Sequence, residues 1–377
     1  MAAAEALSYG EDSLWSNPLL AHAVWTNVFS RTDAAKQSLA RPIFLFGEHS
    51  VTHNTVASDI EITNTAKALS ALLATKVLGQ ASVIEQVVVT VLSGGHALLT
   101  GAPGVAKTTL VRNLASSLGC GWKRIQFTPD LTPFDILGGD TIAFDDNNPD
   151  LKKIVFAPGP IFAPFLLADE INRASPRTQS ALLEAMQEKQ VTLNGKTQFL
   201  PKPFFVFATQ NPIESEGTFP LPEAQLDRFL LNIEMSYPDF QSETEVANLS
   251  AQHVDVSPLI GAELIYGARA SVEKIAMSKA LVDGAVRIVR NTRPRETQLS
   301  VAKNYLEYGA SPRASQALVI ASKALALLRG ASEVEPAHIH AVAPAVLRHR
   351  CLLNFKALSE KKTANSIVEE IISETVL

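Results

Sequence analysis

Cysteine is almost absent from this sequence of 377 residues, which contains only Cys120 and Cys351. Two cysteines cannot build the disulfide framework of a small secreted domain, and their wide separation does not match the ligand spacing of a zinc site. We therefore expect two free thiols in a protein of the reducing cytoplasm.

Long hydrophobic runs and an excess of positive charge are also missing. No stretch reaches the roughly 18 consecutive apolar residues of a membrane-spanning helix, and the N-terminus lacks a basic segment followed by an apolar one. The formal net charge of -5 argues against a broad cationic surface for nucleic acid, although a local basic channel would not show in it. We expect a cytoplasmic protein without membrane insertion or a nucleic-acid partner.

Apolar residues make up 46% of the chain, enough to bury the cores of two or three domains. Residues 1–58 mix acidic and polar residues with several aromatic ones, which predicts a partly ordered N-terminal extension. Residues 59–238 contain helical patterns and short apolar runs, whereas residues 239–377 contain amphipathic helical segments. The sequence therefore predicts an α/β core at 59–238 and a helical second domain, or lid, at 239–377.

Short apolar runs alternate with helical segments through the predicted core. Runs that are apolar throughout are typical of strands buried on both faces, and connections of crossover length place such strands in parallel. The five runs are Ala97–Thr100, Ile125–Phe127, Phe165–Ala168, Phe204–Ala208 and Leu230–Ile233. We predict a five-stranded parallel sheet with flanking helices, preceded by two helices that meet at a turn near Gly79.

A phosphate-binding loop follows the first of these runs and precedes a segment with helical character. Its sequence, Gly-Ala-Pro-Gly-Val-Ala-Lys-Thr, has the spacing of a Walker A motif, in which backbone N–H groups surround phosphate oxygens at a helix N-terminus. Alanine stands where the motif usually has glycine before the lysine, a small change that we expect to be tolerated. The predicted nucleotide-binding residues are Gly101, Pro103, Gly104, Val105, Ala106, Lys107, Thr108 and Thr109.

Two acidic residues and an amide follow two further predicted strands. Asp169 and Glu170 end the run Phe165–Ala168, as in a Walker B motif, so we expect Asp169 and the Thr108 hydroxyl to hold Mg²⁺ and Glu170 to act as general base. Asn211 follows the run Phe204–Ala208 and is our candidate for a sensor of the attacking water or γ phosphate. An asparagine before a proline is also an ordinary turn residue, which is the alternative interpretation.

These motifs together resemble the MoxR family of AAA+ ATPases, a branch of the P-loop NTPases. The resemblance covers roughly residues 60 to 350 and is carried by the Walker A loop, Ala-Asp-Glu-Ile-Asn-Arg-Ala from Ala168, Ala-Thr-Gln-Asn-Pro from Ala208 and Leu-Pro-Glu-Ala-Gln-Leu-Asp-Arg-Phe from Leu221. It implies an AAA+ core with an all-α lid, ATP and Mg²⁺ as cofactors, and a ring-shaped homo-oligomer, usually a hexamer. Gly79 and Gln80 resemble the family's adenine-side segment.

Two arginines take their expected roles from this resemblance. Arg228 would be the arginine finger that reaches the γ phosphate of a neighbouring subunit, or else a salt-bridged residue at the sheet edge. Arg313 would be the lid arginine called sensor 2. It follows Ser311 and Pro312, a pattern typical of a helix start. Whether Arg313 reaches its own subunit's nucleotide or the neighbour's stays open.

Two segments resemble insertions shared by the MoxR and magnesium-chelatase families. They are Gly138–Pro158 and Gln190–Phe199, and the second has an Asn194-Gly195 pair typical of a two-residue hairpin turn. In a ring these segments would face the central pore, or else they are surface decoration.

The resemblance implies chaperone-like remodelling or maturation of protein clients or complexes, together with a partner that carries a von Willebrand factor A domain; the sequence does not identify the client. One alternative is the ATPase subunit of a metal-insertion machine of the magnesium-chelatase type. Another is a DNA motor, whose hairpin should be basic and whose binding should depend on salt.

Overall fold

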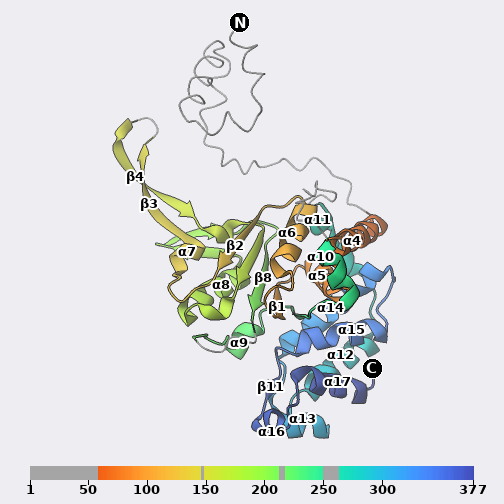
Figure 1. Ribbon diagram of the computed structural model, residues 1–377. Coiled ribbons are helices and arrows are strands. Elements are labelled where there is room, and N and C mark those ends of the chain that lie inside the picture. The colour runs from red at the N-terminus through yellow and green to blue at the C-terminus, as the bar shows by residue number, and fades with distance from the viewer. Residues whose placement is uncertain (1–57, 146–147, 212–216, 249–262) are drawn as a thin grey trace. The chain divides into compact units, whose positions relative to one another are not determined.

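The computed structural model of this chain describes residues 58–145, 148–211, 217–248 and 263–377 (Figure 1). The described residues belong to one compact unit, Val56–Leu377. The predicted N-terminal extension lies outside the described residues except for Ser58, and so does Pro212 of the Asn211 motif. The domain boundaries at residues 58 and 238 stay predictions.

A five-stranded sheet in the order β2-β5-β8-β1-β9 forms the centre of the core, and all its neighbouring strands are parallel. The strands are β1 (Ala97–Gly101), β2 (Trp122–Gln126), β5 (Phe165–Asp169), β8 (Phe205–Gln210) and β9 (Leu231–Met235). All five predicted strands are confirmed. The apolar run predicted β2 only from Ile125, because this strand lies at the sheet edge and its first residues are partly exposed.

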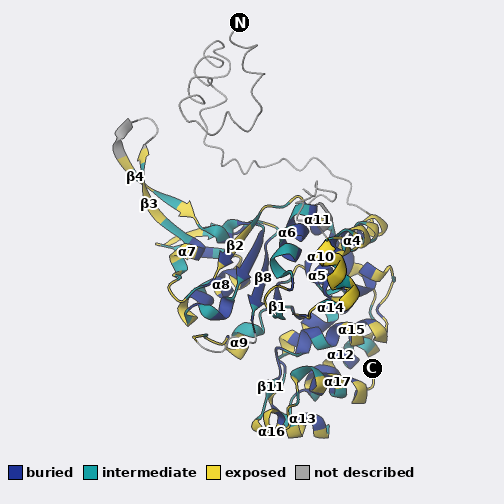
Figure 2. Cartoon of the chain, in the orientation of Figure 1, coloured by how far each residue is buried: buried dark blue, intermediate teal, exposed yellow. Residues whose placement is uncertain are grey.

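The central strands are buried on both faces, which explains why each contains a continuous apolar run before its carboxyl end. Leu98 and Leu99 are neighbours in β1, yet they belong to two different apolar clusters on opposite faces of the sheet. Helices α5 (Ala81–Ser93) and α6 (Lys107–Ser117) contribute to the Leu99 cluster, and α7 (Pro133–Leu137) and α8 (Pro176–Glu188) contribute to the Leu98 cluster. Figure 2 shows the central strands buried and the outer helix faces exposed.

Two helices precede the sheet, as predicted. Helix α4 (Asp59–Ala74) begins with a capping box in which Ser58 and Glu61 each bond the other's backbone N–H, and α5 follows after a short turn. Gly79 in that turn has a φ of 70°, a left-handed conformation that favours glycine.

After Pro238 the described residues, 239–248 and 263–377, form helices apart from the short antiparallel pair β10 (Leu306–Tyr308) and β11 (Leu352–Leu353), which confirms the predicted helical lid. Its helices are α10 (Phe240–Asn248), α11 (Glu263–Lys274), α12 (Lys279–Asn291), α13 (Ser300–Tyr305), α14 (Pro312–Arg329), α15 (Pro336–Leu347), α16 (Phe355–Ser359) and α17 (Ala364–Glu374). A short non-helical segment separates α11 from α12. There the Ala276 carbonyl accepts a hydrogen bond from the Val334 N–H, and Ser278 caps α12.

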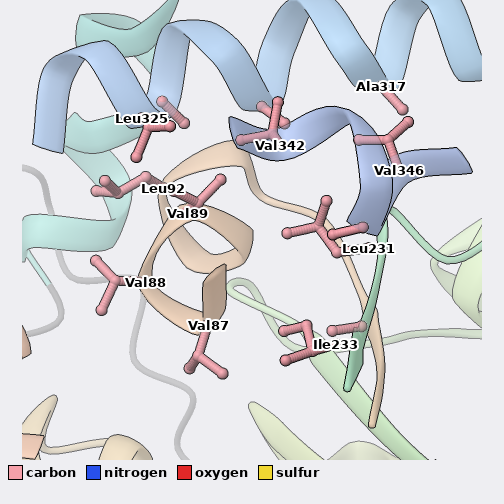
Figure 3. Close-up of a cluster of buried hydrophobic side chains, with 14 of the residues drawn as sticks. Val87, Val88, Val89, Leu92, Leu231, Ile233, Ala317, Leu325, Val342 and Val346 are labelled. Atoms are coloured by element: carbon pink, nitrogen blue, oxygen red, sulfur yellow. The ribbon is translucent and has the colours of Figure 1, made fainter. Parts of the chain in front are cut away.

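The lid and the core share one hydrophobic cluster. Side chains of α14 and α15 pack against α5 and β9 (Figure 3). Leu92 of α5, Leu231 of β9, Leu325 of α14 and Val346 of α15 are all fully buried or nearly so. This packing fixes the start of α14 relative to the sheet.

Both predicted insertions contain hairpins. The first consists of β3 (Gly138–Asp145) and β4 (Asn148–Pro158), and the second of β6 (Gln190–Leu193) and β7 (Lys196–Phe199). Asn194 and Gly195 have φ values of 49° and 76°, which a two-residue turn of the primed type requires. The strong turn signal in the sequence is thereby confirmed.

Both cysteines are free thiols, and burial raises the pKa of Cys351 to about 12. No helix within the described ranges has the length and apolar character needed to cross a membrane.

Candidate functional site

The predicted phosphate-binding loop lies at the carboxyl edge of the sheet. It connects the end of β1 to the start of α6, and β1 lies between β8 and β9. Carboxyl ends of parallel strands are where open α/β sheets bind ligands. The residues after β5 and β8, namely Glu170 and Asn211, are at the same edge.

The loop has a backbone shape that only small residues reach easily. Gly104 has a φ of 84°, and Ala106 has a φ of 66° and a ψ of 23°. A side chain at Gly101 would collide with the backbone carbonyl of Met235 in β9. The Ala106 methyl is therefore accommodated in a left-handed conformation that normally costs alanine about 1–2 kcal/mol.

The loop can receive an anion. Ala106 is the N-cap of α6 and offers no side-chain acceptor, so the first N–H groups of this helix have no capping side chain. A side chain at Gly104 would find nothing within 4 Å, so the space beside the loop is open. Free N–H groups and the positive end of a helix dipole favour a phosphate at Lys107, Thr108 and Thr109.

Lys107 lies across this loop. Its Nζ donates a hydrogen bond to the Gly101 carbonyl at 2.6 Å and a longer one to the Gln210 carbonyl at 3.5 Å. Burial lowers the pKa of Lys107, and the nearby Asp169 and Glu170 carboxylates partly oppose that effect. The ammonium group is therefore held between the loop and the acidic pair.

Asp169 ends β5, and Glu170 follows in a left-handed conformation with a φ of 57° and a ψ of 49°. This conformation is uncommon for a residue other than glycine and costs of order 1–3 kcal/mol. It is maintained by Thr209, whose Oγ1 accepts the Glu170 N–H at 2.8 Å and donates to Asp169 Oδ1 at 2.6 Å. Thr209 therefore fixes both acids relative to β8.

Three more residues contact the acidic pair, and the sequence analysis missed them together with Thr209. Arg124 contacts Asp169 Oδ2 through Nη2 at 2.6 Å and Nε at 3.0 Å. Gln126 Nε2 donates to Glu170 Oε2 at 2.8 Å, and Arg173 Nε lies 2.9 Å from that oxygen. Arg124 and Gln126 are polar residues near the carboxyl end of the edge strand β2, which pairs with β5. Their place at the end of a predicted strand is the sequence feature from which they could have been predicted.

Asn211 and the Gly79-Gln80 segment are at the same edge of the sheet. Asn211 follows β8, between the Asp169 strand and the phosphate loop, and is 6% exposed. Gln80 Nε2 donates to the carbonyl of Ser236, one residue after β9, at 2.6 Å. The Gln80 side chain is thus bound to the protein itself. A nucleotide at this segment would therefore contact the backbone of Gly79 and Gln80 and not the Gln80 side chain.

The residues at this edge fit a magnesium ion held partly by phosphates. Mg²⁺ prefers oxygen ligands and is commonly bound by one or two carboxylates together with substrate phosphates. Asp169 and Thr108 supply a carboxylate and a hydroxyl, and no cluster of three His, Cys, Asp or Glu side chains suited to a metal occurs in the described residues. The donor set fits a metal that arrives with a nucleotide.

The two predicted arginines lie at the opposite, amino edge of the sheet. Arg228 precedes β9 and Arg313 is in the first turn of α14, after the Ser311 cap and Pro312 as predicted. Both line one cleft of about 590 Å³. Five-residue strands such as β1 and β9 are about 16 Å long, more than an arginine side chain spans, so the strands separate both arginines from the phosphate loop of the same chain.

The cleft contains four arginines. Arg269 and Arg350 line it together with Arg228 and Arg313, beside the residues that precede β1. Within the described residues, the buried Nε of Arg228 has no hydrogen-bond partner. A buried N–H without a partner is costly. Asp227 also lines the cleft and pairs with Arg350, and the positive charge of the other arginines favours an anion there.

Comparison with known proteins extends over both parts of the described chain. Residues 96–231 match the family described as ATPase family associated with various cellular activities (AAA), and residues 298–371 match the AAA lid domain. The chain is 42% identical over 307 residues to Chaperone MoxR1 of Mycobacterium tuberculosis, covering 80% of this chain and 79% of that protein. It is 32% identical over 300 residues to Protein MoxR of Paracoccus denitrificans, covering 74% and 86%. A crystal structure described as an ATPase from Cytophaga hutchinsonii superposes with a TM-score of 0.77 at 38% identity, covering 84% of this chain and 96% of that one.

Proposed function

This chain belongs to the MoxR family of AAA+ ATPases and is an ATP-hydrolysing enzyme, and from this premise we propose that it hydrolyses ATP at the interfaces between subunits of a ring. One observation carries the proposal. The phosphate loop and acidic pair lie at the carboxyl edge of the sheet, whereas Arg228 and Arg313 share a cleft at its amino edge. A complete site then needs the carboxyl edge of one subunit and the amino edge of the next.

The carboxyl edge would bind the nucleotide of its own subunit. The N–H groups from Gly104 to Thr109 and the Lys107 ammonium would bind the β and γ phosphates, and Lys107 would exchange its bond to the Gly101 carbonyl for a phosphate oxygen. The backbone of Gly79 and Gln80 would contact the adenine side. Pro103 and Val105 would shape the loop.

Hydrolysis would use the acidic pair and its neighbours. Thr108 and Asp169 would hold Mg²⁺, which when bound neutralises charge on the phosphate oxygens. Glu170 would accept a proton from the attacking water, and Asn211 would orient that water. Gln126 and Arg173 both contact Glu170 Oε2, which fixes the direction of the carboxylate.

The amino edge would complete the neighbouring site. Arg228 would reach the γ phosphate of the next subunit, and such a finger contributes about 10³–10⁵ in rate. Arg313 lines the same cleft as Arg228, and on this basis we infer that Arg313 also acts on the neighbour's nucleotide.

The energy of hydrolysis would serve chaperone-like remodelling or maturation of a protein client. The similarity to a protein named Chaperone MoxR1 supports this role, and a hexameric ring with a von Willebrand factor A domain partner is the assembly that we propose. The hairpins β3–β4 and β6–β7 would contact the client. Ile142 and Ile154, cross-strand partners in β3–β4, are 68% and 76% exposed, as expected of an apolar contact surface.

The proposal is tested by ATPase rate against protein concentration, with oligomer size followed by light scattering. Specific activity of the wild type should rise as the protein assembles. Arg228→Ala should assemble and bind ATP but lose at least about a hundredfold in rate. Arg295→Ala, which removes an exposed arginine outside the cleft, should keep the wild-type rate.

A mixing experiment separates a finger in the neighbour from one in the same subunit. Glu170→Gln should bind ATP and hardly hydrolyse it, because the amide cannot accept the proton. In a mixture, the Glu170→Gln subunit contributes an intact Arg228 and the Arg228→Ala subunit contributes an intact ATP site. Where the two are neighbours a complete site forms, so the activity of the mixture should exceed the sum of the separate variants. Activity that is independent of concentration and not restored by mixing would refute the shared site.

A further inference from the structure

Asp227 precedes Arg228 in the turn Asp227–Leu230 before β9, which is called the arginine turn below. Its side chain connects this turn to two parts of the lid. Its Oδ1 accepts a hydrogen bond from Arg350 Nε at 2.8 Å, and its Oδ2 accepts one from the Ser311 hydroxyl at 2.8 Å. The side chains of Asp227 and Arg350 are 16% and 3% exposed. Both carboxylate oxygens are therefore used by groups that are distant in the sequence.

Arg350 is bound to the arginine turn along its whole guanidinium group. Besides Asp227, it donates to the carbonyls of Phe229 at 2.6 Å and Leu230 at 3.2 Å, and to the Val346 carbonyl in α15. A guanidinium with this many acceptors holds the turn to the end of α15. The backbone on both sides of Arg228 is thereby fixed.

Ser311 makes the matching connection to Arg313. Its Oγ donates to Asp227 Oδ2 and accepts the backbone N–H of Arg313 at 3.1 Å. One hydroxyl thus joins the carboxylate beside Arg228 to the backbone of Arg313, at the N-cap of α14. Two hydrogen bonds of the Ser311 hydroxyl thus connect Asp227, the neighbour of Arg228 in the chain, to the backbone N–H of Arg313.

We propose that Asp227 and Ser311 are positioning residues that hold Arg228 and Arg313 as one rigid pair, so that a neighbouring subunit's nucleotide meets both arginines together. This inference rests on the proposed function, because the pair has a task only if it acts on the next subunit. In this proposal Asp227 and Ser311 act through the two arginines and not on the nucleotide itself. Their hydrogen bonds fix the backbone beside each arginine and so set how far apart the two guanidinium groups lie.

The Ser311 bond is the part of this connection that can be removed without leaving a buried charge unpaired. Replacement of Asp227 would leave Arg350 uncompensated in the interior and would test folding rather than positioning. Ser311→Ala removes one hydroxyl and keeps the Asp227–Arg350 ion pair. Ser311→Thr keeps a hydroxyl at the same position and is the conservative variant.

Loss of the α14 cap is a separate effect that needs its own control. Ser278 caps α12 by accepting the Leu281 N–H, as Ser311 caps α14, and lies in the same lid without contact to the cleft. Ser278→Ala therefore reproduces the loss of a helix cap without altering the arginine pair. Any effect of Ser311→Ala beyond that of Ser278→Ala belongs to the connection that the Ser311 hydroxyl makes between Asp227 and the Arg313 N–H.

The experiment measures kcat, KM, ATP binding and oligomer size for the three serine variants. A misplacement of about 1 Å can cost a hundredfold in rate, so we expect kcat of Ser311→Ala to fall about 10- to 100-fold, with ATP binding and assembly as in the wild type. Ser311→Thr should restore most of the rate, and Ser278→Ala should keep it. A kcat of Ser311→Ala equal to that of Ser278→Ala would overturn the inference.

Mixing with Glu170→Gln identifies the subunit on which Ser311 acts. The Ser311→Ala chain keeps its own ATP site, so an intact neighbour should raise its activity above the sum of the separate variants. If Arg228→Ala is restored by mixing but Ser311→Ala is not, the positioning role fails while the shared site stands. If Arg228→Ala is not restored either, the proposed function itself fails.

Discussion

The Ala106→Gly exchange tests whether the tertiary structure forces the phosphate loop into its shape. Ala106 has a φ of 66° and a ψ of 23°, where a non-glycine residue costs about 1–2 kcal/mol. Glycine removes that cost, but it gives the unfolded chain extra freedom worth about 0.4–1 kcal/mol and removes a partly buried methyl worth less than about 0.8 kcal/mol. We expect the free energy of unfolding to stay constant or rise by about 0.5 kcal/mol.

The opposite exchange in the same loop, Gly104→Ala, provides a comparison that enlarges this small difference in the free energy of unfolding. Gly104 has a φ of 84°, and a side chain there meets nothing within 4 Å, so Gly104→Ala should cost only the backbone term, about 0.5–1 kcal/mol after the gain from a stiffer unfolded chain. The two variants should differ by about 0.5–1.5 kcal/mol, with Ala106→Gly the more stable. Urea unfolding of the nucleotide-free protein, followed by circular dichroism at unchanged slope, provides the measurement. A loss of about 1 kcal/mol on Ala106→Gly, as for glycine inside an ordinary helix, would refute the reasoning.

Three further predictions concern Thr209 and Gly101 at the carboxyl edge of the sheet and His96 at its amino edge. Thr209→Val removes the hydroxyl that bonds the Glu170 N–H and the Asp169 carboxylate, so kcat should fall at least tenfold with folding retained; an unchanged rate would show that the acids are fixed without it. Gly101→Ala places a methyl against a backbone carbonyl of β9, and the soluble yield and the free energy of unfolding should both fall; wild-type stability would show that the loop can shift. Burial lowers the pKa of His96 from 6.5 to about 4, so the unfolded chain binds more protons between these values, and up to about 3 kcal/mol of stability should be lost as the pH falls from 6.5 to 4. Urea unfolding at several pH values measures this effect. The free energy of unfolding should depend less on pH for His96→Gln than for the wild type, and an equal dependence would show that His96 is not the group responsible.

The nucleotide-binding half of the site could be predicted from local sequence. A phosphate loop needs small residues, a lysine and a hydroxyl at fixed spacing between a strand and a helix, so the whole pattern lies within Gly101–Thr109. The strands could be predicted because burial on both faces leaves a run of apolar residues in β1, β5 and β8, up to the polar or small residues at their carboxyl ends. Asp169 and Glu170 followed from their place at the end of such a strand.

The residues that hold these groups in place could not be predicted in the same way. Thr209 and Arg124 come from β8 and β2, which flank β5, so their contacts with Asp169 depend on strand order and register. The gap between α11 and α12 depends on the bridge between Ala276 and Glu333, which lies far along the chain. Such contacts are invisible to periodicity, because periodicity reports only the face that a residue occupies.

The sequence by itself determined that the chain has a phosphate loop, an acidic pair and a buried parallel sheet, because each depends on residues close together in the chain. Only the tertiary structure decided that Arg228 and Arg313 share one cleft at the edge opposite the phosphate loop. That arrangement depends on how α14 and α15 pack against α5 and β9, and on the Asp227 carboxylate that bonds Ser311 and Arg350. Packing between distant segments sets those positions, and no local pattern encodes it.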